Sequence, residues 1–234
     1  MIELHLVLEG PSEEAFVKNV LGPHLVSFGV SAIPMIVRTS RERDGRKHRG
    51  GGNSEKWFKD IQLLLRDRRP VIRVTTIFDL YGLPRGFPGL KDFAATADTH
   101  VRCDQLEAAM AAAVDDKRFI PYLQRHEFEA LVLAGLPTLE GLLDQPVDKK
   151  GLVKLRANIG AIQPEDVNDN VNTAPSKRLA RFIPSYSKGK SKPYFAEQVT
   201  VRTGLAALRA KCPRFSAWVS QLETLRETAA RPAS

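Results

Sequence analysis

Acidic side chains stand at the ends of several apolar segments of this sequence, where they could share one site. They are Glu9, Glu13, Asp79, Glu127 and Glu129. Unpaired carboxylates that converge on one place repel one another. Mg²⁺ or Mn²⁺ relieves that repulsion, because both ions prefer carboxylate and water oxygens. The acids therefore predict a site for one of these two cations.

The apolar segments before the acids predict the strands of a sheet. Residues 2–8 and residues 71–78 have strand-like apolar patterns, and residues 119–123 predict a short fourth strand. Residues 30–37 predict the second strand, which Pro34 assigns to a sheet edge or a bulge. Because the carboxyl ends of parallel strands lie at one side of a sheet, Glu9 and Asp79 should face the same crevice.

Helical stretches separate these strands. Ser12 is the expected N-cap of the first helix, which Gly22 and Pro23 should kink or split. Further helices are expected from Asn53 or Ser54 onward and over residues 101–116. Strands alternating with helices indicate right-handed βαβ units and a parallel sheet.

The two halves of the chain have different patterns. We predict an α/β domain over residues 1–130, with a mostly parallel four-stranded sheet flanked by helices. From residue 131 to residue 234 the pattern changes to short helices interrupted by prolines. This second part is expected to be a helical extension packed on the sheet.

Each acid also has an ordinary structural interpretation. Glu13 and its neighbour Glu14 suit the first turn of a helix electrostatically, and Asp79 can cap the loop that follows it. His126 has no second histidine at the spacing of a zinc protease, so a packed or hydrogen-bonded role suits it better than metal binding. A single nearby histidine also disfavours zinc.

The basic residues are concentrated in two runs. The whole chain has 35 Lys and Arg against 27 Asp and Glu, a net charge of +8. Residues 38–49 hold six cations and two acids, and residues 177–192 hold six cations and no acid. A single run of this kind is typical of a solvated loop, whereas two runs favour a polyanionic partner. The nucleic-acid-binding candidates are Arg41, Arg43, Arg46, Lys47, Lys177, Arg178, Lys190 and Lys192.

Composition excludes several classes of protein. Hydrophobic residues make up 43% of the 234 residues and charged residues 26%, which is typical of a globular protein. Two cysteines are too few for a disulfide framework. No apolar run is long enough for a membrane span, and the first nine residues lack the features of a signal peptide. We therefore expect a cytoplasmic protein with no membrane partner.

The order of strands and motifs resembles the TOPRIM domain of topoisomerases, primases and OLD-type nucleases. The opening Leu8-Glu9-Gly10-x-x-Glu13 is especially similar to the OLD-type version. This likeness covers residues 1 to about 130. A narrower likeness, to a bacterial family of small TOPRIM-like proteins of unassigned function, covers nearly the whole chain. It rests on residues 78–84, 126–130 and 174–178.

The resemblance implies a TOPRIM-like, Rossmann-like fold and a set of roles. Glu9 would act on the nucleophile or leaving group and bind metal, Glu13 would be an adjoining ligand, and Asp79 would be the first acid of an Asp-x-Asp pair. Tyr81 stands at the position of the second acid of that pair. Glu127 and Glu129 are the candidates to supply the missing carboxylate. A basic residue near the metals is also implied. The candidates are Lys188, Lys190 and Lys192, and we assign this catalytic role to Lys188.

These expectations define two candidate functions. The first is a Mg²⁺- or Mn²⁺-dependent nuclease, or a related phosphoryl-transfer enzyme, acting on DNA or RNA. The chain has no Walker loop, so by analogy with OLD-type nucleases a separate ATPase subunit would accompany it, in a phage-defence system. The alternative is a non-catalytic nucleic-acid-binding or scaffold subunit that kept the fold, which the missing second acid favours.

Overall fold

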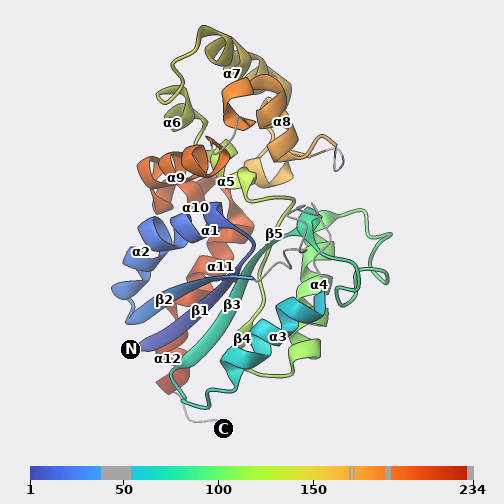
Figure 1. Cartoon of the computed structure of the whole chain (residues 1–234), viewed down its shortest axis with the longest axis vertical. Helices are drawn as coiled ribbons and strands as arrows, with labels where there is room; N and C mark the ends of the chain where they lie inside the picture. The colour runs from blue at the N-terminus through green and yellow to red at the C-terminus, as the bar shows by residue number, and fades with distance from the viewer. Residues whose placement is uncertain (38–53, 169, 171, 188–190, 231–234) are drawn as a thin grey trace, which may run out of the picture.

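The computed structural model describes residues 1–37, 54–168, 170, 172–187 and 191–230. In this part of the chain a five-stranded parallel sheet forms the centre (Figure 1). The strand order is β2-β1-β3-β4, and β5 pairs with the end of β3. The strands are β1 (Ile2–Leu8), β2 (Val30–Ile36), β3 (Ile72–Asp79), β4 (Phe119–Ile120) and β5 (Leu123–Gln124). The predicted α/β class with a mostly parallel sheet is confirmed.

The two longest inner strands are buried because apolar side chains occupy both of their faces. β1 and β3 are predominantly apolar and lie beside each other, with Leu8 opposite Ile77. β2 lies at the edge, where Pro34, which has no N–H to donate, is tolerated. The predicted edge position of this strand is confirmed.

The prediction of a single fourth strand is wrong. β4 and β5 are separate two-residue strands, and Pro121 and Tyr122 interrupt the ladder between them. Side chains of β3 bridge the gap. The Thr76 hydroxyl donates to the Tyr122 carbonyl at 2.8 Å and accepts from the Tyr122 N–H at 2.9 Å, while the Thr75 hydroxyl donates to the Ile120 carbonyl at 2.6 Å.

Helices cover both faces of the sheet. On one face lie α3 (Ser54–Leu65) and α4 (Thr99–Val114), and on the other lie α1 (Pro11–Phe16) and α2 (Gly22–Val26) (Figure 1). The N-cap of α1 is Gly10, not the predicted Ser12, because Pro11 occupies the first turn. A π-helical turn, η1 (Val17–Leu21), joins α1 to α2, and the Gly22 N–H donates to the Val17 carbonyl. The expected irregularity at Gly22 and Pro23 is therefore a π turn.

The helices after residue 130 complete the fold. They are α5 (Glu129–Ala134), α6 (Leu136–Glu140), α7 (Pro146–Ile159), α8 (Pro175–Phe182), α9 (Ser191–Thr203), α10 (Leu205–Lys211), α11 (Pro213–Glu223) and α12 (Leu225–Ala230). Short 3₁₀ turns are η2 (Leu80–Gly82), η3 (Pro164–Asp166) and η4 (Pro184–Ser187). Several of these elements carry a proline in the first turn, where its missing N–H costs no hydrogen bond.

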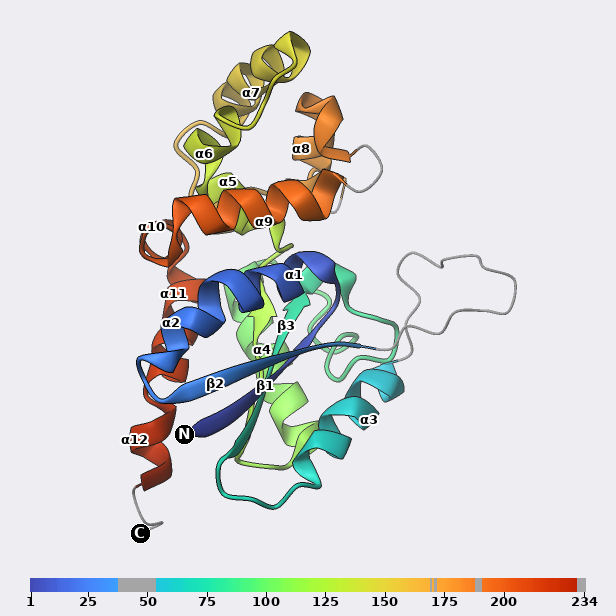
Figure 2. The same ribbon diagram turned by 60° about the vertical axis from the view of Figure 1, so that its left-hand side comes forward.

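One hydrophobic core joins this second part to the sheet. Trp218 of α11 stacks on Tyr122 with ring centroids 4.4 Å apart, and its indole N–H donates to Thr75 at 3.0 Å. Phe215 packs edge-on against Phe16 of α1. Figure 2 shows α9 lying across α1, and α6, α7 and α8 at the end of the molecule away from the N-terminus. Among the helices described, none is long and apolar enough to cross a membrane.

Candidate functional site

Glu9 and Asp79 meet at the carboxyl end of the sheet. Glu9 directly follows β1, and Asp79 is the last residue of the adjacent strand β3. The Asp79 backbone N–H donates to Glu9 Oε1 at 2.6 Å, and Asp79 Oδ1 accepts the N–H of Phe128 at 2.8 Å. The two carboxyl groups are thus fixed by backbone groups, and each keeps a second oxygen for another ligand.

Glu13 joins them from the first turn of α1, where its side chain is buried. Burial and, to a smaller extent, the charge of Glu129 raise the pKa of Glu13 to about 7. Burial and, to a smaller extent, the charge of Glu13 raise the pKa of Glu9 to about 8. For Asp79, burial first and then the charges of Glu9 and Glu13 raise the pKa well above its usual value. These acids therefore form one buried, mutually repelling group.

The neighbouring Glu14 serves a different purpose. Its carboxylate accepts from Lys18 at 2.7 Å, one helical turn away, and about a third of its side chain is exposed. Glu14 therefore has a structural role in the first turn of its helix, as the sequence analysis allowed for both glutamates. Glu13, by contrast, points into the protein.

Glu127 caps the N-terminus of α8. Its Oε2 accepts the N–H of Ser176 at 2.7 Å, and its Oε1 accepts the Ser176 hydroxyl at 2.9 Å. Burial, followed by the charge of Glu129, raises the pKa of Glu127. Both of its oxygens are engaged in this cap, so Glu127 lies beside the acidic group but is occupied by a structural contact.

Glu129 lies at the start of α5 with 1% of its surface exposed. Its Oε1 accepts from Lys192 of α9 at 2.7 Å and from the Tyr186 hydroxyl at 3.2 Å. Its Oε2 is buried and has no hydrogen-bond partner among the described residues. The side chain therefore brings one unsatisfied acceptor to the acidic group.

Among the described residues, Lys192 is the basic side chain that pairs with this site. Burial lowers the pKa of Lys192, but the charge of Glu129, its hydrogen bond and the charges of Asp79 and Glu127 together outweigh that effect and raise the pKa. The charge of Lys192 in turn lowers the pKa of both Glu9 and Glu13. Nearly half of the Lys192 side chain is exposed, so this side chain borders solvent. Lys188, to which we assigned the catalytic role, lies outside the described residues.

Tyr81, two residues after Asp79, turns toward a neighbouring polar network. Its N–H donates to the His126 carbonyl at 3.1 Å, its ring lies 5.3 Å from the His126 ring, and Asn168 donates to its hydroxyl. His126 is buried and hydrogen-bonded to Thr99, and burial lowers its pKa to about 4. His126 thus has the packed, hydrogen-bonded environment expected from the sequence.

Two glycines allow the acids to approach the backbone. A Cβ on Gly82 would lie 2.7 Å from Glu9 Oε2, closer than real Cβ contacts come, and one on Gly10 would lie 3.3 Å from Glu13 Oε2. Residue 82 must therefore be a glycine if Glu9 is to keep its position.

The donor set fits a hard cation in its chemistry. Among the described residues it consists of carboxylates, includes a buried acceptor without a partner on Glu129, and has Lys192 against several acids. In the described part of the chain, no three Asp, Glu, His or Cys side chains are already arranged to hold a metal ion. Binding would therefore require carboxylates such as Glu9 and Asp79 to reorient from their present hydrogen bonds.

Comparison with known proteins gives one match. A family model described as "Domain of unknown function (DUF4276)" matches residues 8–223. The chain belongs to the DUF4276 family. The comparisons with curated proteins and with solved structures found no match. The family match begins at the end of β1 and runs through α11, so it includes every acid of the site.

The nucleic-acid-binding candidates of this DUF4276 chain are distributed over different places. Lys177 is exposed on α8, and the Arg178 side chain donates to the Thr173 carbonyl at 2.8 Å. Lys192 belongs to the acidic site. The remaining candidates, Arg41, Arg43, Arg46, Lys47 and Lys190, lie outside the described residues.

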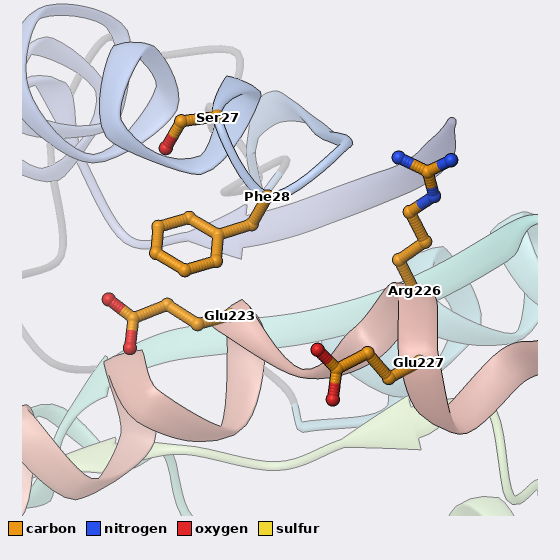
Figure 3. A pocket seen from close by; sticks show the side chains of 5 residues that line it. All are labelled: Ser27, Phe28, Glu223, Arg226 and Glu227. Carbon is orange, nitrogen blue, oxygen red and sulfur yellow. The ribbon is translucent and has the colours of Figure 1, made fainter.

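One hollow of the DUF4276 chain lies away from the acids. It has a volume of about 460 Å³ and is lined by residues that follow α2 and by side chains of α11 and α12 (Figure 3). Its Glu223 already pairs with His24 at 2.7 Å and with Arg209. The polar groups there serve to hold α2 against the C-terminal helices.

The sequence analysis missed two residues of the site, Ser176 and Tyr186. Both contact acids from segments about 50 residues further along the chain. Pro175-Ser176 is a recognisable helix start, but the partner of such a helix start depends on tertiary packing. No local signal identifies it.

Proposed function

We propose that this protein is a Mg²⁺- or Mn²⁺-dependent phosphodiester hydrolase acting on nucleic acid. The observation that carries the proposal is the buried group of Glu9, Glu13 and Asp79, whose pKa values are raised by burial and by one another. Among the described residues, Lys192 is the lysine that pairs with these buried acids, and a buried excess of carboxylates favours binding of a cation. Raised pKa values of this kind are also frequent at catalytic sites.

The residues of the proposed site would have different roles. Glu9, Glu13 and Asp79 would hold the cation, and Glu129 offers its unpartnered oxygen beside them. When bound, such a cation activates a water molecule and stabilises the leaving oxygen. Lys192, half exposed and fixed by Glu129, is placed to contact a phosphate oxygen.

The structural contacts around the site keep these groups in place. The Asp79 N–H orients Glu9, the Phe128 N–H orients Asp79, and Ser176 holds Glu127. Because Glu9 and Asp79 would have to leave these hydrogen bonds to hold a cation, the contacts fix the metal-free arrangement of the acids.

One observation favours the alternative of a non-catalytic nucleic-acid-binding subunit. Tyr81 stands where the resemblance places a second acid, and its hydroxyl is engaged with Asn168. A site with one acid fewer binds divalent cations more weakly. The two candidates therefore differ in whether the acidic group binds metal and cleaves.

The test compares wild type with Glu9→Gln, and Glu14→Gln is the matched control. Each replacement removes one carboxylate near the start of α1, but only Glu9 belongs to the buried group. Mn²⁺ binding is measured by calorimetry. Hydrolysis is assayed with Mg²⁺ and with Mn²⁺ on single-stranded DNA, duplex DNA and RNA, alone and with any ATPase encoded beside the protein.

We expect wild type and Glu14→Gln to bind Mn²⁺ and to cleave, and Glu9→Gln to lose both properties, because an amide holds a hard cation poorly and accepts no proton. If wild type binds nucleic acid but neither binds Mn²⁺ nor cleaves any substrate, the scaffold function replaces the enzymatic one.

A further inference from the structure

A polar cluster lies beside the acidic site, between the end of β3 and the start of α4. We define this Tyr81 cluster as Tyr81, Thr99, Arg102, Arg125 and His126. The Thr99 hydroxyl accepts from Arg125 Nε at 2.6 Å and lies 3.1 Å from His126 Nε2. The His126 ring packs on the Tyr81 ring, with the two centroids 5.3 Å apart. These contacts tie the first turn of α4 to a residue that follows Asp79 by two positions.

His126 keeps its backbone in a conformation that residues with a side chain disfavour. Its φ is 63°, in the left-handed region. The Tyr81 N–H donates to the His126 carbonyl at 3.1 Å, and the Glu127 N–H donates to the Arg125 carbonyl at 3.0 Å. Strained residues persist where the surrounding structure holds them, and they gather at ligand-binding and active sites. The strain at His126 therefore marks the Tyr81 cluster as a candidate binding site.

Two polar atoms of the cluster are buried without a hydrogen bond. Within the described part of the chain, Arg102 Nε and His126 Nδ1 have no partner. Buried polar atoms are nearly always hydrogen-bonded in native proteins, and an exception indicates a water molecule, an ion or a ligand. The Nε–H of an arginine is always a donor, so the partner that Arg102 lacks is an acceptor.

Arg102 lies close to the Tyr81 hydroxyl. It follows Thr99 by three residues on α4, which places both residues on one side of the helix. Burial raises the pKa of Tyr81, whereas the Asn168 hydrogen bond and the charges of Arg102 and Arg125 oppose that rise. Such charges act mainly over a few ångströms. Arg102 and Tyr81 are both partly exposed, so the cluster borders solvent.

The other contacts hold the cluster together. Arg125 pairs with Asp166 and donates to Thr99, so its guanidinium group is already engaged. Asn168 donates to the Tyr81 oxygen. Because that oxygen accepts from Asn168, the phenol proton is directed elsewhere and can be donated to a ligand. Arg102 and Tyr81 are therefore the members that offer donors.

The chemistry of these donors suits a phosphate group. A guanidinium group presents N–H donors in a planar fork that matches phosphate oxygens, and a phenol adds a neutral donor. The chain itself joins the cluster to the acids, since Tyr81 follows Asp79 by two residues and His126 directly precedes Glu127. A phosphate bound here would lie beside a cation held by the acids, as cleavage of a phosphodiester requires.

We propose that Arg102 and Tyr81 bind a phosphate group of the substrate and hold it beside the acidic group. Arg125, Thr99 and His126 are positioning residues. The inference rests on the proposed function, because it names the residues that recognise the substrate of that site.

The experiment measures phosphate recognition without hydrolysis. Full-length protein in EDTA is titrated onto a short fluorescein-labelled single-stranded oligonucleotide, made with and without a terminal phosphate, and anisotropy is followed at several salt concentrations. The buffer is mildly acidic, below the pKa values of Glu9 and Glu13 (about 8 and about 7), so that these acids stay largely protonated. Inorganic phosphate serves as the competitor.

The variants are Arg102→Gln and Tyr81→Phe, and Arg102→Lys keeps the charge without the planar group. Arg68→Gln is the matched control, because it removes the same charge from an exposed position before β3, at the end of that strand opposite Asp79. Thermal melting verifies that each variant is folded. Tyr81→Phe removes only a hydroxyl, so it carries the test if Arg102→Gln does not fold.

We expect Arg102→Gln to bind about tenfold more weakly or worse, because a hydrogen bond to a charged group is lost. Its salt slope should fall by ~0.7, the contribution of one phosphate contact on a single strand. Tyr81→Phe should bind more weakly with an unchanged slope, since it removes a neutral donor. Arg102→Lys should lie between wild type and Arg102→Gln, and the control should match wild type.

The two oligonucleotides distinguish the source of the phosphate. If the terminal phosphate tightens binding only when Arg102 is present, the bound group is a monoester. If both oligonucleotides bind equally and depend equally on Arg102, it is a diester of the backbone. In either case inorganic phosphate should displace the strand from wild type more effectively than from Arg102→Gln.

Two results would overturn the inference. They are failure of wild type to bind either oligonucleotide, and equal affinities of Arg102→Gln, Tyr81→Phe and the control. The proposed function fails separately. If wild type binds through Arg102 but neither binds Mn²⁺ nor cleaves, the phosphate contact remains and the enzyme does not. Cleavage by wild type with an unchanged KM in both variants keeps the enzyme and removes the phosphate contact.

Discussion

The backbone N–H of Asp79 donates a hydrogen bond of 2.6 Å to the carboxylate of Glu9, 70 residues earlier in the chain. This contact joins the ends of two adjacent parallel strands, β1 and β3, and it holds one buried acid against the backbone of another. It explains how the fold tolerates the two acids side by side. One of them is stabilised by a donor that the other residue provides.

The stability of the metal-free protein should fall as pH rises. Burial raises the pKa of Glu9 to about 8 and that of Glu13 to about 7. The folded protein therefore holds protons that the unfolded chain has released above a pKa of about 4.3. The stability that these bound protons contribute is fully present below the pKa of the unfolded chain, and it is lost as pH approaches 8. We expect a loss of several kcal/mol, at ~1.4 kcal/mol per pKa unit.

Thermal melting in EDTA from pH 5 to pH 9 measures this loss. Glu9→Gln should flatten the pH dependence and be as stable as wild type or more stable at pH 8, because it relieves the repulsion. Glu14→Gln should retain the wild-type profile. A wild-type stability that rises steadily between pH 5 and pH 8 would contradict the raised pKa values.

Replacing Gly82 should disturb the site without unfolding the protein. In Gly82→Ala the new Cβ would lie 2.7 Å from Glu9 Oε2, so the carboxylate must move. We expect Mn²⁺ affinity to fall about tenfold or more, while the free energy of unfolding changes by about 1 kcal/mol. Gly141→Ala is the control, because its Cβ would meet its nearest neighbour at an ordinary 3.5 Å. Equal Mn²⁺ affinity in the two variants would show that the position of Glu9 is unimportant.

The ion pair of Glu129 and Lys192 should be measurable as a coupling energy. Lys192→Gln leaves Glu129, which is 1% exposed, without its cation. We expect destabilisation by about 1–2 kcal/mol, limited by the half-exposed position of Lys192. In a double-mutant cycle with Glu129→Gln, the double variant should be less destabilised than the sum of the single ones. Lys192→Arg should restore part of the loss, and strict additivity would argue against the pair.

Glu127 should behave as a helix cap. Glu127→Ala removes both acceptors of Ser176, so we expect a loss of about 1–2 kcal/mol in the free energy of unfolding. Glu127→Gln keeps one acceptor and should lose less, and Ser176→Ala removes only the hydroxyl bond. Denaturant unfolding and Mn²⁺ titration are compared for all three. Unchanged stability of Glu127→Gln with a large loss of Mn²⁺ affinity would instead identify Glu127 as a metal ligand.

The sequence by itself determined the central elements and the meeting of two acids. An alternating apolar pattern predicts β1 and a run rich in β-branched residues predicts β3, and helices between them require a parallel arrangement. Once the strands are parallel and adjacent, Glu9 and Asp79 must lie at one end of the sheet. That result depends on local pattern and on chain chirality, both of which are readable from the sequence.

Only the tertiary structure decided which of the other polar residues complete the site. Glu13 points inward whereas Glu14 pairs with Lys18, Glu127 is taken up by the cap on α8, and Lys192 pairs with Glu129. These partners lie in helices packed from distant parts of the chain. Their contacts depend on how side chains fill a shared core, and no spacing within the sequence encodes that packing.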